Sequence, residues 1–582
     1  MSQPDEFTTL LHAIAEKSMH FFTQLQNNPD ARMSLIKHYI EFTEYLYQLA
    51  VLVSTDPQKV WLMNLSYWQQ AATLAQNQLA HWLQGKPFPT TDQRFAHEDW
   101  QNNPLFNFMS HQYLLASQHI NLLLQQKEYD HLHAIKKLRF FSQRYLDALS
   151  PANFLATNPT LVTETIQSRG KNLLKGLHNL LSDLEHDASA LYIKMTDKSA
   201  FKVGENLACT PGKVIFRNEM MELIQYTPTT EDVFSVPLLI IPPWINKYYI
   251  LDLSPHNSLV RWLVSQGIRV FIISWVNPDA KLAHKDLFDY LHEGPQTALE
   301  VIKKQLSCKQ VNALGFCIGG TLLTLLLAYH KAHACKDIKS ATFLASLIDF
   351  SDPGDIAAFI DEQQINQLEK EMHKKGYLPG KFMVDSFNSL RANDLIWSFF
   401  IKNYLQGKNP VPFDILYWNS DCTNMPAAMH SSYLRTMYLN NDLIKPNKII
   451  LNNTLIDITQ ITTPTFFLST EKDHIAPWKT TYLGFQIMKG PKRFVLGGSG
   501  HIAGIINPPI NHKYTYKTLA NNKLSAEEWY QKAITYQGSW WPQWYKWLTR
   551  YSGALKSAAS STASAYLPIS DAPGTYVFVP SE

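Results

Sequence analysis

The chain lacks the features of several protein classes. It has no run of 18 uninterrupted apolar residues, so no membrane-spanning helix is expected. Its first residues, MSQPDEFTTL, lack a basic segment followed by an apolar core, so no secretory signal is expected either. The formal net charge of +3 is small for 582 residues and argues against nucleic acid as the main partner.

Cysteine is scarce and scattered, and no CxxC pair occurs. The five cysteines are Cys209, Cys308, Cys317, Cys335 and Cys422. This pattern fits neither a disulfide framework nor a zinc site. We therefore expect no metal ion and a reducing, cytoplasmic compartment.

Glycine is nearly absent from the first quarter of the chain. Through Ser150 the only glycine is Gly85. Apolar residues recur there at helical spacing, as at Leu35, Tyr39, Phe42 and Leu46. The sequence therefore predicts an all-helical N-terminal domain over residues 1–200.

After Phe201, short apolar runs alternate with helical patterns. The runs span residues 236–241, 270–275, 311–315, 340–347, 465–469 and 494–496, and a further pair of strands is expected within 213–226. Strand and helix in alternation predict βαβ units and a mostly parallel, twisted sheet, so the fold class is α/β. We expect this catalytic domain over residues 201–551.

Two segments stand apart from the expected sheet. Residues 330–441 are far more than one βαβ crossover needs and are predicted to form an inserted cap over the active site. Residues 552–582 begin with the small, polar stretch SGALKSAASSTASA and are predicted to be a linker followed by a tail that docks back on the fold.

A nucleophile pattern lies at the centre of the α/β region. Gly315, Cys317 and Gly319 form G-x-C-x-G between a strand-like run and a helix-like run. This is the nucleophile-elbow pattern with cysteine in place of serine. The emerging helix aims free N–H groups at the sulfur, and the N–H of Ile318 is the expected oxyanion donor. The alternative is a buried structural cysteine between packing glycines.

Two later loops supply candidates for the partners of the nucleophile. In this type of elbow the order along the chain is nucleophile, acid, histidine. Asp473 follows the apolar strand TPTFFLS, and His501 lies in the glycine-rich turn after FVLGG. Glu471 competes for the role of the acid and His474 for that of the base.

A second oxyanion donor should come from the loop after an early strand. The loop IPPWINKYYI fits, and its two prolines have no N–H to offer. The donor is therefore expected to be Trp244 or Ile245, and the sequence leaves both open.

A cysteine nucleophile favours acyl transfer between thioesters. Exchange of one thioester for another is nearly isoenergetic, so an acyl group can pass reversibly from coenzyme A to Cys317. A thioester that awaits an alcohol must be kept from water, which the cap could do.

The chain resembles the class I polyhydroxyalkanoate synthases of the α/β-hydrolase superfamily. The resemblance is strongest from about Phe201 to Trp547 and rests on these segments: INKYYILDLSPHNSLVRW, SWVNPD, LGFCIGGT, LRANDLIWSFFIKNYLQGKNPVPFDILYWNSDCTNMPAAMH, YLRTMYLNNDL, TEKDHIAPW, FVLGGSGHIAGIINPP and GSWWPQW. The nucleophile, acid and base of the family fall on Cys317, Asp473 and His501.

The resemblance implies a polymerase of short (R)-3-hydroxyacyl-coenzyme A, chiefly 3-hydroxybutyryl-coenzyme A. It also implies a homodimer on polyester granules, possible granule-associated protein partners, and no cofactor beyond the coenzyme A that the substrate carries. It leaves open whether Asp473 orients His501 or activates the hydroxyl, and whether one cysteine or two across a dimer extend the chain.

Two other functions remain as alternatives. One is a thioesterase or polyester depolymerase on the same fold, with water as the acceptor. The other is a non-catalytic granule coat that relies on the helical domain. Neither the residues that hold coenzyme A nor the role of the N-terminal domain follows from the sequence.

Overall fold

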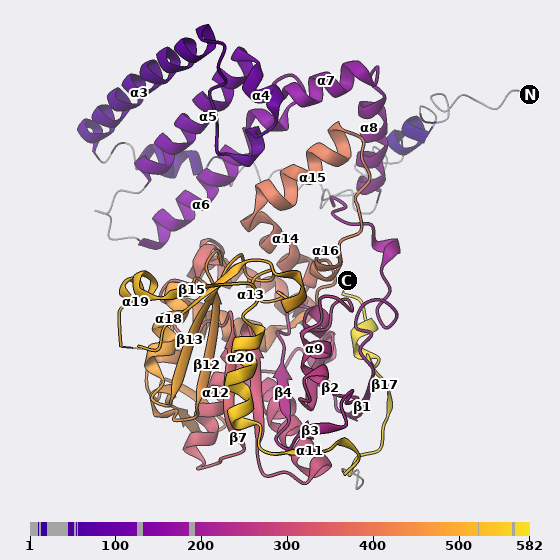
Figure 1. Cartoon of the computed structure of the whole chain (residues 1–582). Coiled ribbons are helices and arrows are strands. Elements are labelled where there is room, and N and C mark those ends of the chain that lie inside the picture. Colours follow the sequence, from indigo (N-terminus) through magenta and orange to yellow (C-terminus); the bar gives the residue numbers. More distant parts are fainter. Residues whose placement is uncertain are drawn as a thin grey trace, which may run out of the picture. The chain divides into compact units, whose positions relative to one another are not determined.

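The structure is a computed structural model of the whole chain, and it describes residues 10, 13–19, 43, 45–51, 54, 56–124, 132–185, 192–521, 523–560 and 565–581. Leu35, Tyr39 and Phe42, which entered the helical prediction, lie outside these residues. The chain divides into two compact units (Figure 1). The first comprises Met1–Asp197 and Phe387–Pro412, and the second comprises Lys198–Ser386 and Phe413–Glu582.

The first unit is helical where the structure describes it. Its longer helices are α3 (Pro57–Leu83), α5 (Pro104–Leu123), α6 (Leu132–Ala148), α7 (Pro159–Gln167) and α8 (Lys171–Leu184), and α4 (Glu98–Asn102) is short. Three of them begin with Asp or Asn as the N-cap, followed by proline. Asp56, Asn103 and Asn158 each accept hydrogen bonds from the first turn, and each is followed by proline at the first helical position. This combination fixes a helix start locally.

Residues 387–412 correct the predicted domain boundary. We expected them in the cap of the catalytic domain, but they pack as η8 (Asn393–Trp397), α15 (Ser398–Phe400) and η9 (Ile401–Leu405) within the first unit. Asn172 donates to the Leu405 carbonyl at 2.8 Å, and Tyr404 donates to Asp183 at 2.7 Å. These bonds join residues more than 200 positions apart, so they cannot be predicted from a local sequence pattern.

The second unit is built on one sheet of 11 strands in the order β15-β14-β13-β12-β7-β6-β4-β5-β2-β1-β17. The strands are β1 (Gly212–Arg217), β2 (Met221–Tyr226), β4 (Leu238–Ile241), β5 (Val270–Trp275), β6 (Val311–Phe316), β7 (Ile338–Leu344), β12 (Thr465–Thr470), β13 (Lys492–Gly497), β14 (Thr515–Thr518), β15 (Ile534–Gln537) and β17 (Ser570–Asp571). From β5 to β13 neighbouring strands are parallel, and the edges are antiparallel. The α/β-hydrolase fold class is confirmed.

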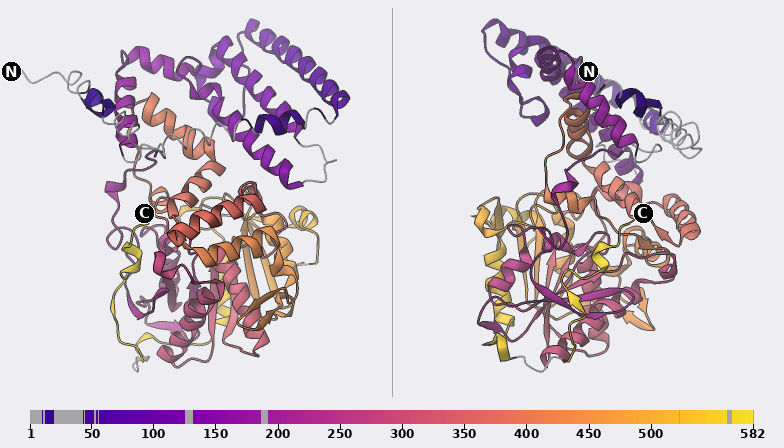
Figure 2. Two further views of the ribbon diagram at one scale, coloured as in Figure 1. Left: turned by 180° about the vertical axis from the view of Figure 1, so that it is seen from behind. Right: turned by 90° about the vertical axis from the view of Figure 1, so that its right-hand side faces the viewer.

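Helices cover both faces of this sheet (Figures 1 and 2). They are α9 (Leu259–Ser265), α10 (Leu287–Leu291), α11 (Thr297–Leu306), α12 (Ile318–Ala332), α18 (Trp478–Ile487), α19 (Ala526–Lys532) and α20 (Trp541–Leu548). The strands of the centre are buried on both faces, which is why they read as continuous apolar runs. The core of the unit lies between these layers.

The inserted cap begins later than predicted. Residue 330 lies inside α12, and β7 then joins the sheet, so the insertion starts only after Leu344. The part in the second unit contains α13 (Glu362–Lys375), most of α14 (Gly380–Leu390), α16 (Asp414–Asn419), α17 (Ala427–Tyr433) and the π-helical turn η10 (Leu434–Leu439), with a small pair of strands, β8 (Tyr377–Leu378) and β9 (Met425–Pro426).

The C-terminal segment docks on the second unit. β16 (Leu555–Ser557) pairs with β3 (Asp232–Phe234), and β17 adds the last strand of the large sheet beside β1. Residues 552–560, expected to be a linker, thus include a paired strand, whereas residues 561–564 lie outside the described chain. Near the end, the buried amine of Lys247 donates to the Val579 carbonyl at 2.6 Å.

Candidate active site

Cys317 stands at the sharp turn between β6 and α12. Its backbone has φ 53° and ψ −122°, which an L-residue adopts only under strain. Its N–H donates to the Leu344 carbonyl at 2.9 Å, which ties the turn to β7. The turn holds the half-buried sulfur at the carboxyl end of the parallel strands, where open α/β sheets place their chemistry.

The glycines around the turn are required by close packing. A Cβ on Gly315 would lie 2.4 Å from the Cα of Gly320, and one on Gly319 would lie 2.0 Å from the carbonyl oxygen of Ile241. Real Cβ atoms do not approach backbone this closely. The second contact also shows that the first turn of α12 abuts the end of β4.

His501 and Asp473 meet at the same edge of the sheet. Nδ1 of His501 lies 2.7 Å from Oδ2 of Asp473, and both side chains are buried. The other carboxylate oxygen accepts from the N–H groups of Ile475 and Ala476 at 2.9 and 2.8 Å. Because a carboxylate only accepts, Nδ1 carries the proton and Nε2 is left as the basic nitrogen.

The electrostatics of His501 set it apart from an ordinary histidine. Burial alone would lower the pKa of His501. The Asp473 carboxylate and the Cys317 sulfur raise it by more than burial lowers it, so the net pKa lies well above its usual value. The hydrogen bond that Nδ1 of His501 donates to Asp473 contributes to the rise in pKa, as does the side-chain hydrogen bond between His501 and Cys317. His501 is therefore coupled to an acid on one side and to the nucleophile on the other.

Aromatic residues fix the position of the histidine turn. The ring of Phe316 stacks on His501 with centroids 5.7 Å apart. The indole N–H groups of Trp540 and Trp541 donate to the carbonyls of Gly504 and Ile505, each at 3.0 Å. These contacts join α20 to a turn 36 residues earlier, so they could not be predicted from the residues around His501.

The competing candidates do not occupy these positions. The histidine bonded to Asp473 is His501 rather than His474. Glu471 accepts a hydrogen bond from Tyr530 and lies 3.8 Å from the amine of Lys517. Burial raises the pKa of the other four thiols, those of Cys209, Cys308, Cys335 and Cys422. Cys317 is the cysteine that neighbours His501.

The candidate oxyanion donors gather beside the elbow. Ile318 opens α12, and the loop with Trp244 and Ile245 leaves the end of β4, which touches Gly319. Thr423 holds this loop by its carbonyls: its hydroxyl donates to Trp244, and its N–H donates to Ile245 at 3.0 Å. Thr423 comes from the cap, and its role could not be predicted from the loop alone.

Two cap tyrosines lie near the nucleophile. Tyr433 ends α17 and Tyr438 lies in η10, and their rings are 5.6 Å apart. Burial raises the pKa of both hydroxyls, and Cys317 adds to the rise, so the two hydroxyls stay protonated beside the sulfur. π-helical turns are frequent at functional sites, but sequence periodicity does not reveal them.

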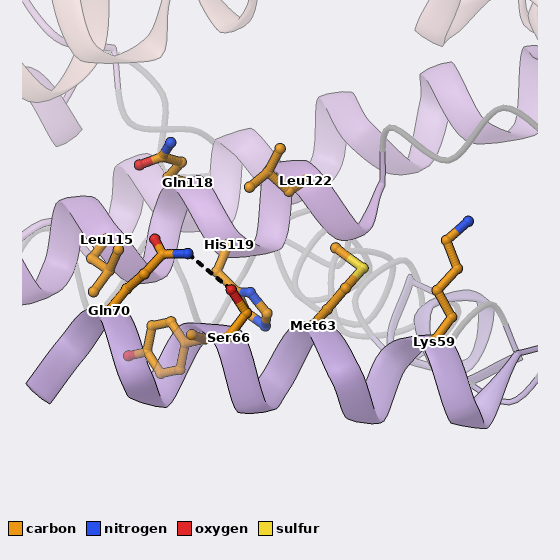
Figure 3. Close-up of a pocket in the computed structure, with 9 residues that line it drawn as sticks. Lys59, Met63, Ser66, Gln70, Leu115, Gln118, His119 and Leu122 are labelled. Atoms are coloured by element: carbon orange, nitrogen blue, oxygen red, sulfur yellow. Dashed lines mark hydrogen bonds between the residues drawn. The ribbon is translucent and has the colours of Figure 1, made fainter.

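The structure also contains cavities away from this site. A groove of about 340 Å³ lies between α3 and α5 of the first unit and includes Met63, Tyr67 and His119 (Figure 3). His119 bonds Asn64 at 2.9 Å, and burial lowers its pKa. A second cavity of about 370 Å³ lies beside Trp82 and Phe108. Neither contains a residue of the predicted active site.

The described residues show neither a metal-binding cluster nor a membrane span. They include no group of three or more His, Cys, Asp or Glu side chains that could hold a metal ion. They also include no helix that is long and apolar enough to cross a membrane.

Comparison with known proteins identifies related chains. Residues 91–263 match the family described as "Poly-beta-hydroxybutyrate polymerase (PhaC) N-terminus", and residues 237–508 match "alpha/beta hydrolase fold". A poly(3-hydroxyalkanoate) polymerase of Methylorubrum extorquens is 44% identical over 94% of this chain and 92% of its own. The poly(3-hydroxyalkanoate) polymerase subunit PhaC of Rhizobium meliloti is 45% identical over 84% and 80%, and that of Cupriavidus necator is 41% identical over 84% and 83%.

Proposed function

The chain belongs to the poly(3-hydroxyalkanoate) polymerase family, and we propose that it polymerises (R)-3-hydroxyacyl-coenzyme A through an acyl thioester on Cys317. Membership makes it an enzyme of the acyltransferase type that forms a polyhydroxyalkanoate. The residue roles, the preferred acyl group and the course of elongation are parts of the proposal.

The observation that carries the proposed mechanism is the chain of contacts from Asp473 through His501 to Cys317. The Nδ1 atom of His501 lies 2.7 Å from Asp473, and its coupling to Cys317 raises its pKa. An acid, a base and a strained thiol in this order are the parts that covalent acyl transfer needs.

In the acylation step, Nε2 of His501 takes the thiol proton and the thiolate of Cys317 attacks the acyl carbon of the substrate. The N–H of Ile318, with that of Trp244 or Ile245, stabilises the oxyanion. The carbon–sulfur bond to coenzyme A then breaks, and the leaving thiolate takes the proton from His501. Meanwhile the Asp473 carboxylate accepts the hydrogen bond from Nδ1 and stabilises the positive charge of the imidazolium.

In the elongation step, the 3-hydroxyl of another hydroxyacyl group attacks an acyl thioester. His501 accepts the hydroxyl proton, the new ester bond forms, and the cysteine leaves as thiolate and recovers the proton. Each cycle adds one ester and releases one coenzyme A. The buried Tyr433 and Tyr438 support this course because they help to keep water from the thioester.

We further propose 3-hydroxybutyryl-coenzyme A as the chief substrate, since the sequence resembles the class I synthases. Cytoplasmic residence on polyester granules, as a homodimer, belongs to the same proposal. A thioesterase on this fold would release free acid, and a coat protein would leave the substrate intact.

The test supplies purified protein with 3-hydroxybutyryl-coenzyme A and follows thiol release together with insoluble polymer. We expect both to rise together, and Cys317→Ala to reduce both to background. Mass spectrometry after brief exposure should find the acyl group on Cys317. Thiol release with free 3-hydroxybutyrate and no polymer would identify a hydrolase, and acylation of Cys422 or Cys308 would refute the assigned nucleophile.

A further inference from the structure

The loop that carries the second candidate oxyanion donor contains a buried lysine. Lys247 lies in the same loop after β4 as Trp244 and Ile245, and only 3% of it is exposed. Its amine donates to the main-chain carbonyl of Val579 at 2.6 Å. A buried ammonium group is costly unless it is hydrogen-bonded. This bond therefore ties the loop to the C-terminal tail of the chain.

The same tail residues meet two other segments near the active-site edge of the sheet. The side-chain amide of Asn277, in the loop after β5, donates to the carbonyl of Pro580 at 2.7 Å. In the cap, the sulfur of Cys422 lies 3.1 Å from the hydroxyl oxygen of Ser581. Residues 579–581 therefore join the loops after β4 and β5 to the cap.

The tail is anchored before it reaches these loops. Glu222 of β2 is fully buried and accepts hydrogen bonds from the N–H groups of Thr575 and Tyr576 at 2.9 and 3.1 Å. The next residue, Val577, is buried in the core of the unit. The carbonyl that Lys247 binds is therefore held in place by the body of the fold.

The cap holds the loop after β4 by its main-chain carbonyls. Thr423 binds the carbonyls of Trp244 and Ile245, and the indole N–H of Trp418 donates to the carbonyl of Lys247 at 2.7 Å. The N–H groups of Trp244 and Ile245 have no acceptor among the residues that the structure describes. The loop is thus secured through its carbonyls and one amine, which leaves its N–H groups for a ligand.

We propose, on the basis of the acyl transfer proposed for Cys317, that Lys247 is a positioning residue for the oxyanion donor of this loop. It acts through the carbonyl of Val579 and does not touch the reacting atoms. Because Thr423 and Lys247 bind two different segments, the backbone around Trp244 and Ile245 cannot turn without breaking one of these bonds. Misplacement of a catalytic group by about 1 Å can lower a rate on the order of 10²-fold.

A direct effect of the lysine charge on the nucleophile is the alternative role. Burial lowers the pKa of the Lys247 amine, and the charges that oppose this shift are those of Asp421 and Cys422. Both residues belong to the cap segment beside the tail, and Cys317 is not among the groups that act on the amine. The amine is therefore coupled to the tail and the cap rather than to the nucleophile.

The test compares two reactions of Cys317 in Lys247→Met, which removes the amine and keeps an apolar chain. We expect single-turnover acylation by 3-hydroxybutyryl-coenzyme A to fall roughly 10- to 100-fold, because the oxyanion donor is misplaced. Alkylation by iodoacetamide should stay at the parent rate, since displacement of iodide forms no oxyanion. A lysine that only stabilised the fold or closed the cap would change both rates together.

Lys285→Met is the matched control. Lys285 is also buried in the second unit, where its amine donates to Glu293 at 2.6 Å. We expect this change to lower the free energy of unfolding, as Lys247→Met does, without a selective loss of acylation. A chain that ends at Phe578 lacks the acceptor of the Lys247 bond. Adding Lys247→Met to this shorter chain should lower acylation no further, since both changes remove the same bond.

Parent-like acylation of Lys247→Met, or an equal loss of acylation and alkylation, would overturn the proposal. If Lys247→Met does not fold, the chain ending at Phe578 provides the same comparison of two rates. If the parent itself is not acylated, the proposed function fails, and hydrogen exchange of residues 244–251 then decides the role of the lysine separately. Faster exchange in Lys247→Met than in Lys285→Met would support the positioning role, and equal exchange would refute it.

Discussion

Replacing Asp473 by asparagine should stop the proposed catalysis while keeping the fold. The asparagine carbonyl can stay on the N–H groups of Ile475 and Ala476, which now bind Oδ1 at 2.9 and 2.8 Å. Its amide N–H then points at Nδ1 of His501, where Oδ2 lies at 2.7 Å in the parent. His501 must respond by moving its proton to Nε2, and in that form it cannot accept the proton of Cys317.

The expected loss is large. In a serine protease triad the same Asp to Asn change lowers kcat about 10⁴-fold, which corresponds to about 5.4 kcal/mol of activation free energy. We expect a loss of this order in both Cys317 acylation, followed by mass spectrometry in a single turnover, and steady-state release of coenzyme A. Thr470→Val, which removes only a 3.3 Å bond to Oδ2, should cost less than about tenfold.

The same experiment separates the two roles considered for Asp473. If Asp473 orients His501, both acylation and elongation slow together. Acylation of Cys317 at the parent rate in Asp473→Asn, with elongation abolished, would refute this reasoning and place Asp473 at the attacking hydroxyl instead.

Two further predictions concern the elbow and the cap. Gly319→Ala places a Cβ 2.0 Å from the Ile241 carbonyl oxygen. We therefore expect the free energy of unfolding, measured by denaturant titration, to fall by about 1–3 kcal/mol and polymerisation to be strongly reduced. An unfolding curve and a rate equal to those of the parent would contradict the packing argument. In the parent, Arg435 of η10 donates to the Glu369 carboxylate of α13 at 2.8 Å, which holds η10 in place. Glu369→Gln should therefore increase several-fold the rate at which a neutral alkylating reagent modifies Cys317. An unchanged rate would show that this pair does not close the cap. The Arg435 hydrogen bond lowers the pKa of Glu369 from 4.5 to about 2, so the contribution of the pair is present above pH 4.5 and is lost as the pH falls towards about 2, which hydrogen exchange of the α13 amides should follow.

The central strands and the elbow could be predicted because their causes are local. β5 spans the residues of its apolar run, and β6 ends one residue after its own, because burial on both faces requires continuous apolar sequence. Gly315 and Gly319 flank Cys317 because of contacts within one turn and with one neighbouring strand. Local residue types were sufficient here.

Elements whose partners lie far along the chain could not be predicted. β15 is fully exposed along its length and has no apolar run, so its pairing with β14 leaves little trace in the sequence. The hydrogen bonds of Thr423 to the loop after β4 and of Trp540 to Gly504 join segments separated by long intervals. Such contacts depend on the assembled fold rather than on spacing.

The placement of residues 387–412 has a consequence for synthesis on the ribosome. The helical unit contains the first 197 residues, yet Tyr404 and Leu405 complete its bonds to Asp183 and Asn172. At roughly 5–20 residues per second, the ribosome needs on the order of ten to forty seconds to reach Pro412 from Lys198. Until then the nascent helices lack these packing partners. They are therefore exposed to chaperones while the elbow of the other unit is being synthesised. A fragment ending at Asp197 would remain permanently at that stage.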